Sequence, residues 1–532
     1  MKRNSRFLFF YFQFSAFLAM MLLIAAMPAM TDPLLQQALP NGGKAVTPTQ
    51  EDCGCDVPPP SGPQLWGTVN GIKIYDTEFK GILAPQIDPL LQKLKDLRVQ
   101  GLDLLILSRI LELEAKAAGS NRLDFISKNV DSKLKNPTDA EINAWIEKNP
   151  PPNPAEKTNA TYRQSVAVIL KDLKRQEEIK ALAESLKKSH RLTLITNANT
   201  ADAEGQRVLA VLDEAPIRRT DLDEFLKGQF YDLKKQIFEI RRQALDRKIF
   251  LILLEAEAMR QNLTIQVLVN REILDKAPMA TTEQVEKFYN DNRPQIPQPL
   301  EQVRGNIANY LRQEAIKQQE QRLSQEYAKK AAIQYSLPGI IEPVYKINTQ
   351  GRPSKGSASA AVTIIEFSDY QCPFCARIQP VIHQVLDLYP GKIRLVAREF
   401  PIVGHAYSRK AANAALSAHA QGKYFEYTAL LYQNQLDLSE SNLIKFAQAV
   451  GMDVARLKAE LAEGKHERAI DEDVDEAKRV GLTSTPTFYI NGRKLEILSL
   501  DGFKQAIERE LATVAKPSGP RAGNSPAKTA SQ

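Results

Sequence analysis

The stretch EFSDYQCPFCARIQP, residues 366–380, contains two of the four cysteines in a chain of 532 residues. It begins at the end of a β-branched run, AVTIIEF (361–367), that is typical of a buried strand. Apolar residues then recur at helical spacing, so Cys372 is predicted at the N-terminus of a helix. Unpaired N–H groups there favour a thiolate, and Cys375 lies one turn later, within reach for a disulfide. We expect an exposed first thiol and a shielded second thiol, which suits disulfide exchange.

Two other interpretations of Cys372 and Cys375 are a structural disulfide and a metal site. The position at a helix start argues against a purely structural bridge. A metal site needs further ligands, and no second pair of Cys or His residues stands at ligand spacing. We therefore expect no metal and no other cofactor.

A second motif lies downstream in GLTSTPTFYINGRKLEIL (481–498), where Thr485-Pro486 precedes another β-rich run. Residues 402–480, between the two motifs, have helical patterns. The order of strand, CPFC, helical segment and T-P-T-F-Y resembles the DsbA family of thiol–disulfide oxidoreductases. The resemblance covers residues 359–514 and implies an α/β thioredoxin fold with a helical insertion at about 402–480.

The resemblance also implies roles for individual residues. Cys372 would be the attacking thiol, Cys375 the resolving thiol, and Glu366 a buried acid that relays a proton. A cis X-Pro bond would face the cysteines and present a backbone edge to an extended substrate peptide. DsbA carries a histidine between its cysteines and this chain does not, so a strongly oxidising character is not implied. The implied substrate-binding residues are Thr485, Pro486, Pro373 and Phe374.

Several further residues near these motifs have two interpretations each. Asp369 and Tyr370 precede the first cysteine, where they could tune access to it, and turn chemistry explains Asp369 equally well. We expect three of the histidines of this region to be surface or packing residues. They are His383, His405 and His419.

The other two cysteines, Cys53 and Cys55, lie in EDCGCD, where the acidic neighbours would raise their thiol pKa values. They could form a second redox pair or be oxidised surface cysteines without a catalytic role. The sequence leaves this choice open.

The N-terminus predicts export. A basic start, MKRNSR, precedes an apolar run over residues 7–30, so residues 1–30 resemble a signal peptide or an uncleaved membrane anchor. Residues 31–64 are rich in Pro and Gly and are predicted to be a linker. We expect a periplasmic or other extracytoplasmic location, where disulfides persist.

An internal repeat follows the linker. LRVQGLDLLILSRILELEAKAAG (97–119) aligns with IRRQALDRKIFLILLEAEAMRQN (240–262), and PTDAEINAWIEKN (137–149) aligns with ATTEQVEKFYNDN (280–292) at the same spacing. The chain is therefore predicted to contain a tandem duplication. Each copy should begin with a short strand-like piece and continue with about four helices.

The copies, at 65–200 and 207–340, resemble the N-terminal chaperone region of the SurA-type periplasmic folding factors. The features that carry this resemblance are VNGIKIYDTEF, the apolar helix after it, PTDAEINAWIEKN, and then a long charged helix. No space remains for the prolyl isomerase domain that usually accompanies this region, so isomerase activity is not implied.

The remaining segments complete the predicted organisation. Residues 341–358 are predicted to be a second linker, and residues 515–532 a disordered tail. The fold class is thus multidomain: mostly α-helical repeats followed by an α/β thioredoxin fold. The net charge is only +7 and basic residues alternate with acidic ones, which argues against a nucleic-acid partner.

The leading hypothesis is an exported thiol–disulfide oxidoreductase that carries helical modules for its clients. The alternative is mainly a SurA-like binding chaperone with a secondary redox domain, and a third option makes the repeats a rigid spacer from a membrane anchor. Expected partners are unfolded or cysteine-containing exported proteins and a membrane or soluble redox protein. Self-association is left open.

Overall fold

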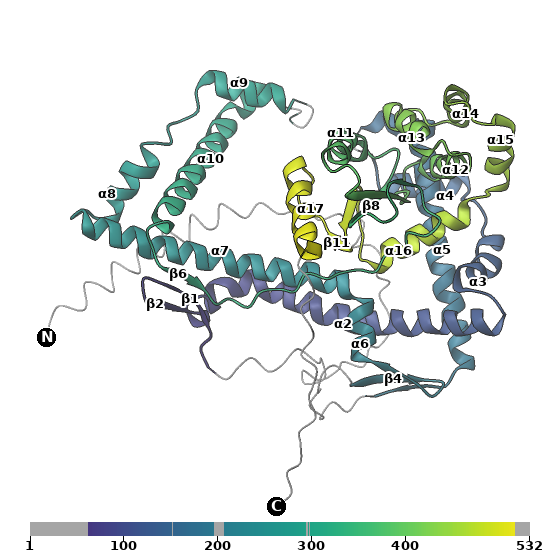
Figure 1. Ribbon diagram of the computed structural model, residues 1–532, viewed down its shortest axis with the longest axis horizontal. Coiled ribbons are helices and arrows are strands. Elements are labelled where there is room, and N and C mark those ends of the chain that lie inside the picture. The colour runs from purple at the N-terminus through teal and green to yellow at the C-terminus, as the bar shows by residue number, and fades with distance from the viewer. Residues whose placement is uncertain (1–61, 152, 196–206, 294–295, 297, 516–532) are drawn as a thin grey trace, which may run out of the picture. The chain divides into compact units, whose positions relative to one another are not determined.

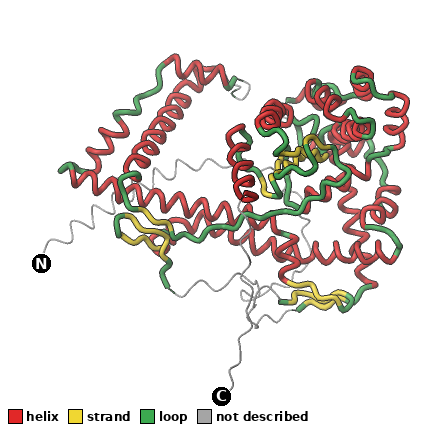
Figure 2. Tube along the Cα trace, in the orientation of Figure 1, coloured by secondary structure: helices red, strands yellow, loops and turns green. Residues whose placement is uncertain are grey.

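The structure is a computed structural model that describes residues 62–515, except residues 152, 196–206, 294–295 and 297. The predicted signal or anchor, almost all of the first linker, Cys53 and Cys55, and the predicted tail lie outside the described residues. The described part is mostly helical (Figure 2). Within it, no helix has the length and apolar character that crossing a bilayer requires.

The N-terminal part of the described chain has the same order of elements twice. Each copy has a β-hairpin, a long helix, shorter helices, a second long helix and a short strand. The first copy contains β1 (Leu65–Val69), β2 (Ile72–Tyr75), α2 (Lys80–Ala117), α3 (Arg122–Asn129), α4 (Asp139–Lys148), α5 (Ala160–Leu186) and β3 (Leu192–Leu194). The second contains β4 (Val208–Leu212), β5 (Ala215–Arg218), α6 (Arg219–Phe225), α7 (Lys227–Arg260), α8 (Ile265–Val269), α9 (Thr282–Asp291), α10 (Leu300–Ala328) and β6 (Ile333–Tyr335).

The start of each copy is a two-stranded hairpin rather than the single strand-like piece that the sequence predicts. The two central residues of each turn, Asn70-Gly71 and Asp213-Glu214, all have positive φ. Such turns match the twist of paired strands, which explains why the chain reverses there.

The two copies exchange their last strands. β1 pairs with β2 and with β6, the last strand of the second copy (Figure 1). β4 pairs with β5 and with β3, the last strand of the first copy. Each hairpin is therefore completed by the other copy, and one hydrophobic cluster contains residues of both, such as Ile106 and Leu245.

The C-terminal part is built on a five-stranded sheet in the order β11-β10-β8-β9-β7, in which only β8 and β9 are parallel. Side chains alternate along β8 (Val362–Ser368). Ile364 packs in the cluster with α11 and α17, whereas Ile365 packs in the opposite cluster. The other elements are β7 (Ser354–Gly356), α11 (Pro373–Leu388), β9 (Ile393–Glu399), α12 (Ser408–His419), α13 (Tyr424–Gln433), α14 (Glu440–Ala449), α15 (Val454–Glu463), α16 (Glu467–Arg479), β10 (Thr487–Ile490), β11 (Arg493–Lys494) and α17 (Leu500–Ala515).

The prediction of a plain linker at residues 341–358 is wrong in part. Strand β7 adds to the sheet beside β9, and Tyr345 is buried edge-on against Tyr489. The short SKG strand has no β-branched residue, so the sequence carried no local strand signal. The sheet therefore begins before residue 359.

Candidate functional site

The first cysteine stands where the sheet passes into helix α11. Cys372 has extended backbone dihedrals at the N-cap position, and Pro373 occupies the first helical turn, where a missing N–H has no cost. The N–H groups of Cys375 and Ala376 point back to the Cys372 carbonyl oxygen at 3.1 and 3.3 Å. The reactive sulfur thus belongs to the residue at the positive end of a helix.

Both thiols are free and both are buried, with Cys372 only 4% exposed and Cys375 fully enclosed. The expectation of an exposed first thiol is therefore wrong. Two segments close over it: the Cys372 Sγ lies 3.4 Å from the Thr485 carbonyl oxygen, and Gln435 donates to the Cys372 carbonyl oxygen at 2.8 Å. Phe374, between the cysteines, is instead 60% exposed.

The surroundings separate the acidities of the two thiols. A hydrogen bond from Cys375, joined by donors from Thr485 and from the backbone of the first helical turn, lowers the pKa of Cys372 to about 5. Burial raises the pKa of Cys375 far above its usual range. Cys372 is therefore a thiolate at neutral pH, and Cys375 remains protonated.

The second motif lies directly over Cys372. The Thr485–Pro486 peptide bond is cis, as the resemblance implies. The Thr485 hydroxyl is buried, and among the described residues no other group accepts its hydrogen, so it is available to donate to a thiolate at Cys372. Residues 484–486 thus form a wall of the site, next to strand β10.

Glu366 lies beneath the cysteines on strand β8. It is 4% exposed and accepts a hydrogen bond from Gln379 Nε2 at 2.9 Å. Burial raises its pKa to about 7, against the lowering effect of hydrogen bonds from Gln379 and Ser368. Ser368 also bonds the Tyr432 hydroxyl at 2.6 Å and acts on the pKa of Cys375. A polar network therefore joins the buried acid to the buried thiol.

Replacement of Glu366 by glutamine is expected to stabilise the protein at pH 8 and to be nearly neutral at pH 4. The raised pKa means that folding favours the protonated acid, so wild-type stability falls as pH rises from about 4.5 to about 7. The difference corresponds to about 3 kcal/mol. Urea unfolding at both pH values measures it, with the exposed Glu463 replaced by glutamine as the control. An equal effect of Glu366→Gln at both pH values would contradict the prediction.

Several site residues escaped the sequence analysis. The sequence could have identified Ser368 and Gln379 from their spacing. Ser368 shares a strand face with Glu366, and Gln379 follows Cys375 by one helical turn. Gln435 and Tyr432 come from the helical insertion and gave none. Tyr370, for which a role in access was considered, is buried and donates to Glu399 Oε1 at 2.9 Å.

The histidines differ from one another. His383 is exposed on α11, and His419 lies edge-on to Tyr424, so both have the surface or packing positions that the sequence predicts. His405 instead contacts the buried Asp369, with its Nδ1 at 3.1 Å from Asp369 Oδ1. The expectation that His405 is only a surface or packing residue therefore leaves out its contact with a buried carboxylate.

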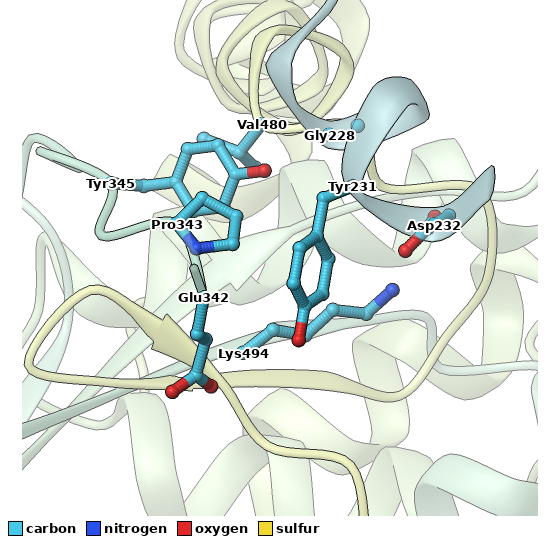
Figure 3. A pocket seen from close by; sticks show the side chains of 9 residues that line it. Gly228, Tyr231, Asp232, Glu342, Pro343, Tyr345, Val480 and Lys494 are labelled. Atoms are coloured by element: carbon cyan, nitrogen blue, oxygen red, sulfur yellow. The ribbon is translucent and has the colours of Figure 1, made fainter. Parts of the chain in front are cut away.

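A pocket away from the cysteines is too small for a substrate. Figure 3 shows Tyr231, Asp232, Glu342 and Lys494 around it. Its volume of about 10 Å³ holds no more than one water molecule. The chemistry described above therefore rests on the environment of the cysteines. The complete lining is Gly228, Tyr231, Asp232, Glu342, Pro343, Tyr345, Val480, Gly481 and Lys494.

Comparison with known families agrees with this architecture. The sequence model of a family described as Thioredoxin matches residues 348–509. These residues are a thioredoxin-like domain. The match begins before β7, so the domain includes residues 348–358 of the predicted second linker.

Curated relatives match only part of the chain. An antiporter named Na(+)/H(+) antiporter NhaA 3 from Salinispora tropica is 32% identical over 157 residues, which are 29% of this chain and 24% of that protein. Na(+)/H(+) antiporter NhaA 1 from Salinispora arenicola is 33% identical over 157 residues, which are again 29% of this chain and 24% of that protein. The chain thus spans about a quarter of the length of these relatives.

Solved structures include several similar chains. BdbD from Bacillus subtilis is 22% identical and covers 32% of this chain and 98% of its own, with a TM-score of 0.30. A thioredoxin-like oxidoreductase from Silicibacter pomeroyi is 30% identical and covers 31% and 95%, with a TM-score of 0.29. The thiol-disulfide exchange protein alpha-DsbA2 from Wolbachia pipientis is 23% identical and covers 30% and 87%, with a TM-score of 0.27.

Proposed function

We propose that the chain is an exported thiol–disulfide oxidoreductase that exchanges disulfides with cysteine-containing client proteins through its CPFC motif. The observation that carries this proposal is the pair of unequal thiols: a stabilised thiolate at Cys372 beside a protonated Cys375, under the cis Thr485–Pro486 bond. The thioredoxin-like domain supports the same chemistry.

The oxidising direction has two steps. A client thiolate attacks the Sγ of Cys372, the Cys372–Cys375 bond breaks, and Cys375 leaves as a thiolate that takes up a proton. A second client thiolate then attacks the client sulfur of the mixed disulfide, so the client gains a disulfide and Cys372 leaves as a thiolate. The client loses two electrons and the enzyme gains them. Reduction of a client disulfide is the reverse sequence.

Glu366 would serve the protonation of Cys375. An acid with a pKa of about 7 exchanges protons readily near neutral pH, and the Ser368 hydroxyl lies between the two groups in the polar network. Thr485 and Pro486 would present their backbone edge to the client peptide, and Pro373 and Phe374 would contact it at the rim. A membrane or soluble redox protein would return the pair to its starting state.

The test is reversible exchange with glutathione and with a reduced, unfolded client. The full chain is used with Cys53 and Cys55 replaced by serine, so that only the CPFC pair reacts. We expect the parent to exchange disulfides and Cys372→Ser to reduce the rate to that of the uncatalysed reaction. An oxidising equilibrium would identify a disulfide donor, and a reducing one a reductase or isomerase. No reversible exchange would overturn the proposal.

A binding chaperone is the second candidate, because the helical copies carry many exposed apolar side chains. If it is the main function, a variant with both Cys372 and Cys375 replaced by serine should still suppress the aggregation of an unfolded client. Loss of suppression in that variant would favour the enzyme. The exposed apolar residues include Ile82, Val99, Leu104, Leu173, Met259, Val267, Met279 and Tyr310.

A further inference from the structure

The dipeptide between the two cysteines, Pro373-Phe374, carries no charge that could act on the Cys372 thiolate. Phe374 is an apolar residue whose ring faces outward and lies 4.3 Å from the Arg377 guanidinium carbon. The Cys372 side chain is nevertheless buried, and in a buried site a nearby positive charge has a larger effect than in solution. The segment between β9 and α12 brings one such group to the site.

Asp369 organises this part of the site. Its side chain is buried, and its Oδ1 accepts from the Cys372 N–H at 3.1 Å and from the Ser408 hydroxyl at 2.7 Å. Its Oδ2 accepts from the Ile402 N–H at 2.6 Å. The Nδ1 of His405 lies 3.1 Å from the same Oδ1 atom. One carboxylate oxygen therefore holds both the backbone of the attacking cysteine and the imidazole ring.

The tautomer of His405 follows from this contact. A carboxylate oxygen can only accept, so the His405 Nδ1 carries a hydrogen and Nε2 is the atom that gains the second proton. The hydrogen bond to Asp369 raises the pKa of His405. Burial of the ring opposes this rise, and the charges of Asp369 and Cys372 add to it. Within the described residues, these two are the charged groups that act on the ring.

We propose that His405, held in place by Asp369, supplies the Cys372 thiolate with the positive charge that Pro373-Phe374 lacks, and so favours the reduced form of the CPFC pair. This inference rests on the proposed function. His405 is a positioning and electrostatic residue and takes no part in bond making. Reduction of the pair by a client dithiol consumes two electrons and one proton and leaves a thiolate at Cys372 and a thiol at Cys375. Protonation of His405 stabilises only that reduced product.

The thiolate determines how the stabilisation of the reduced form by His405 depends on pH. The thiolate raises the pKa of His405 in the reduced protein, and its loss in the disulfide lowers that pKa. The extra stabilisation of the reduced form is therefore present where Cys372 is a thiolate and His405 is protonated. It disappears as pH rises through the pKa that His405 has in the reduced state, and also as pH falls through the Cys372 pKa of about 5.

The first test is His405→Gln in the full chain with Cys53 and Cys55 as serine. Glutamine can still donate to Asp369 but carries no charge. We expect a higher Cys372 pKa, followed by thiolate absorbance, and a shift of the glutathione equilibrium toward the disulfide by about threefold to tenfold. His383→Gln removes an exposed imidazole from helix α11 and is expected to change neither quantity. Wild-type values for His405→Gln would overturn the inference.

A second measurement does not depend on a variant. The chain has five histidines, so NMR can follow their titration in the parent protein in both redox states. The pKa of His405 must be higher in the reduced form, and equal values would overturn the inference. Neither titration requires catalysis. If the chain is inactive but the pKa of His405 still differs between the two redox states, the result counts against the proposed function and not against this inference.

Discussion

Replacement of Cys375 by serine is expected to leave the protein covalently joined to its client. Cys372 can still attack a client disulfide, but no second thiol is present one turn along the helix to break the mixed disulfide. Resolution would then depend on thiols from solution, which lack the effective concentration of a neighbouring group. We expect the lifetime of the adduct to lengthen by at least about 10³-fold.

The adduct is measured by non-reducing electrophoresis and intact mass, again with Cys53 and Cys55 replaced by serine. Cys372→Ser provides the matched control, because it keeps one thiol of the pair. That thiol is fully enclosed and has a raised pKa, so no adduct should form. An adduct of Cys372→Ser that formed as readily as that of Cys375→Ser would reverse the assigned roles.

Replacement of Asp473 by alanine is expected to destabilise the thioredoxin-like domain by about 3–5 kcal/mol. Asp473 lies on α16 with its side chain enclosed, and its Oδ1 is 2.7 Å from Arg352 Nε and 2.6 Å from Arg398 Nε. Its Oδ2 accepts from the Glu399 N–H at 2.8 Å. Removal of the carboxylate would leave Arg398, whose side chain is 2% exposed, as a buried charge without this partner.

Calorimetry of the full chain measures this effect as a lower midpoint of the transition that includes residues 348–509. The matched control is Glu472→Ala, because Glu472 also pairs with Arg352, at 3.0 Å, but its side chain is 41% exposed. An exposed pair contributes at most about 1 kcal/mol, so the control should change the midpoint little. Equal effects of the two replacements would show that burial of the ion pair is unimportant.

Local patterns in the sequence were sufficient for the centre of the site. The β-branched run before CPFC and the helical spacing after it predicted β8 and α11, because both signals lie within a few residues of the chain. Glu366 was found through a resemblance, and its burial follows from its place on β8. The same reasoning predicted an exposed Cys372, since it considered the helix alone and not the loop that covers it.

Contacts between distant segments explain the remaining failures. From the helical insertion, Gln435 contacts Cys372 and His405 contacts Asp369, and the positions of both depend on how several helices pack. The exchange of strands between the copies was not predicted for a related reason. Duplicated copies offer nearly equivalent edges to each other's last strands, so hydrophobic pattern alone does not decide which copy completes which hairpin.

This exchange has a consequence for the order in which the chain can fold. Gly67 pairs with Tyr335, so the sheet that contains the N-terminal hairpin is completed only after nearly the whole helical region has been translated. Until then β1 presents a free edge, to which a strand from a neighbouring nascent chain could add. Two chains that traded their β6 strands would remain entangled. The N-terminal hairpin therefore stays open to such an exchange until residues 333–335 of its own chain have paired with it.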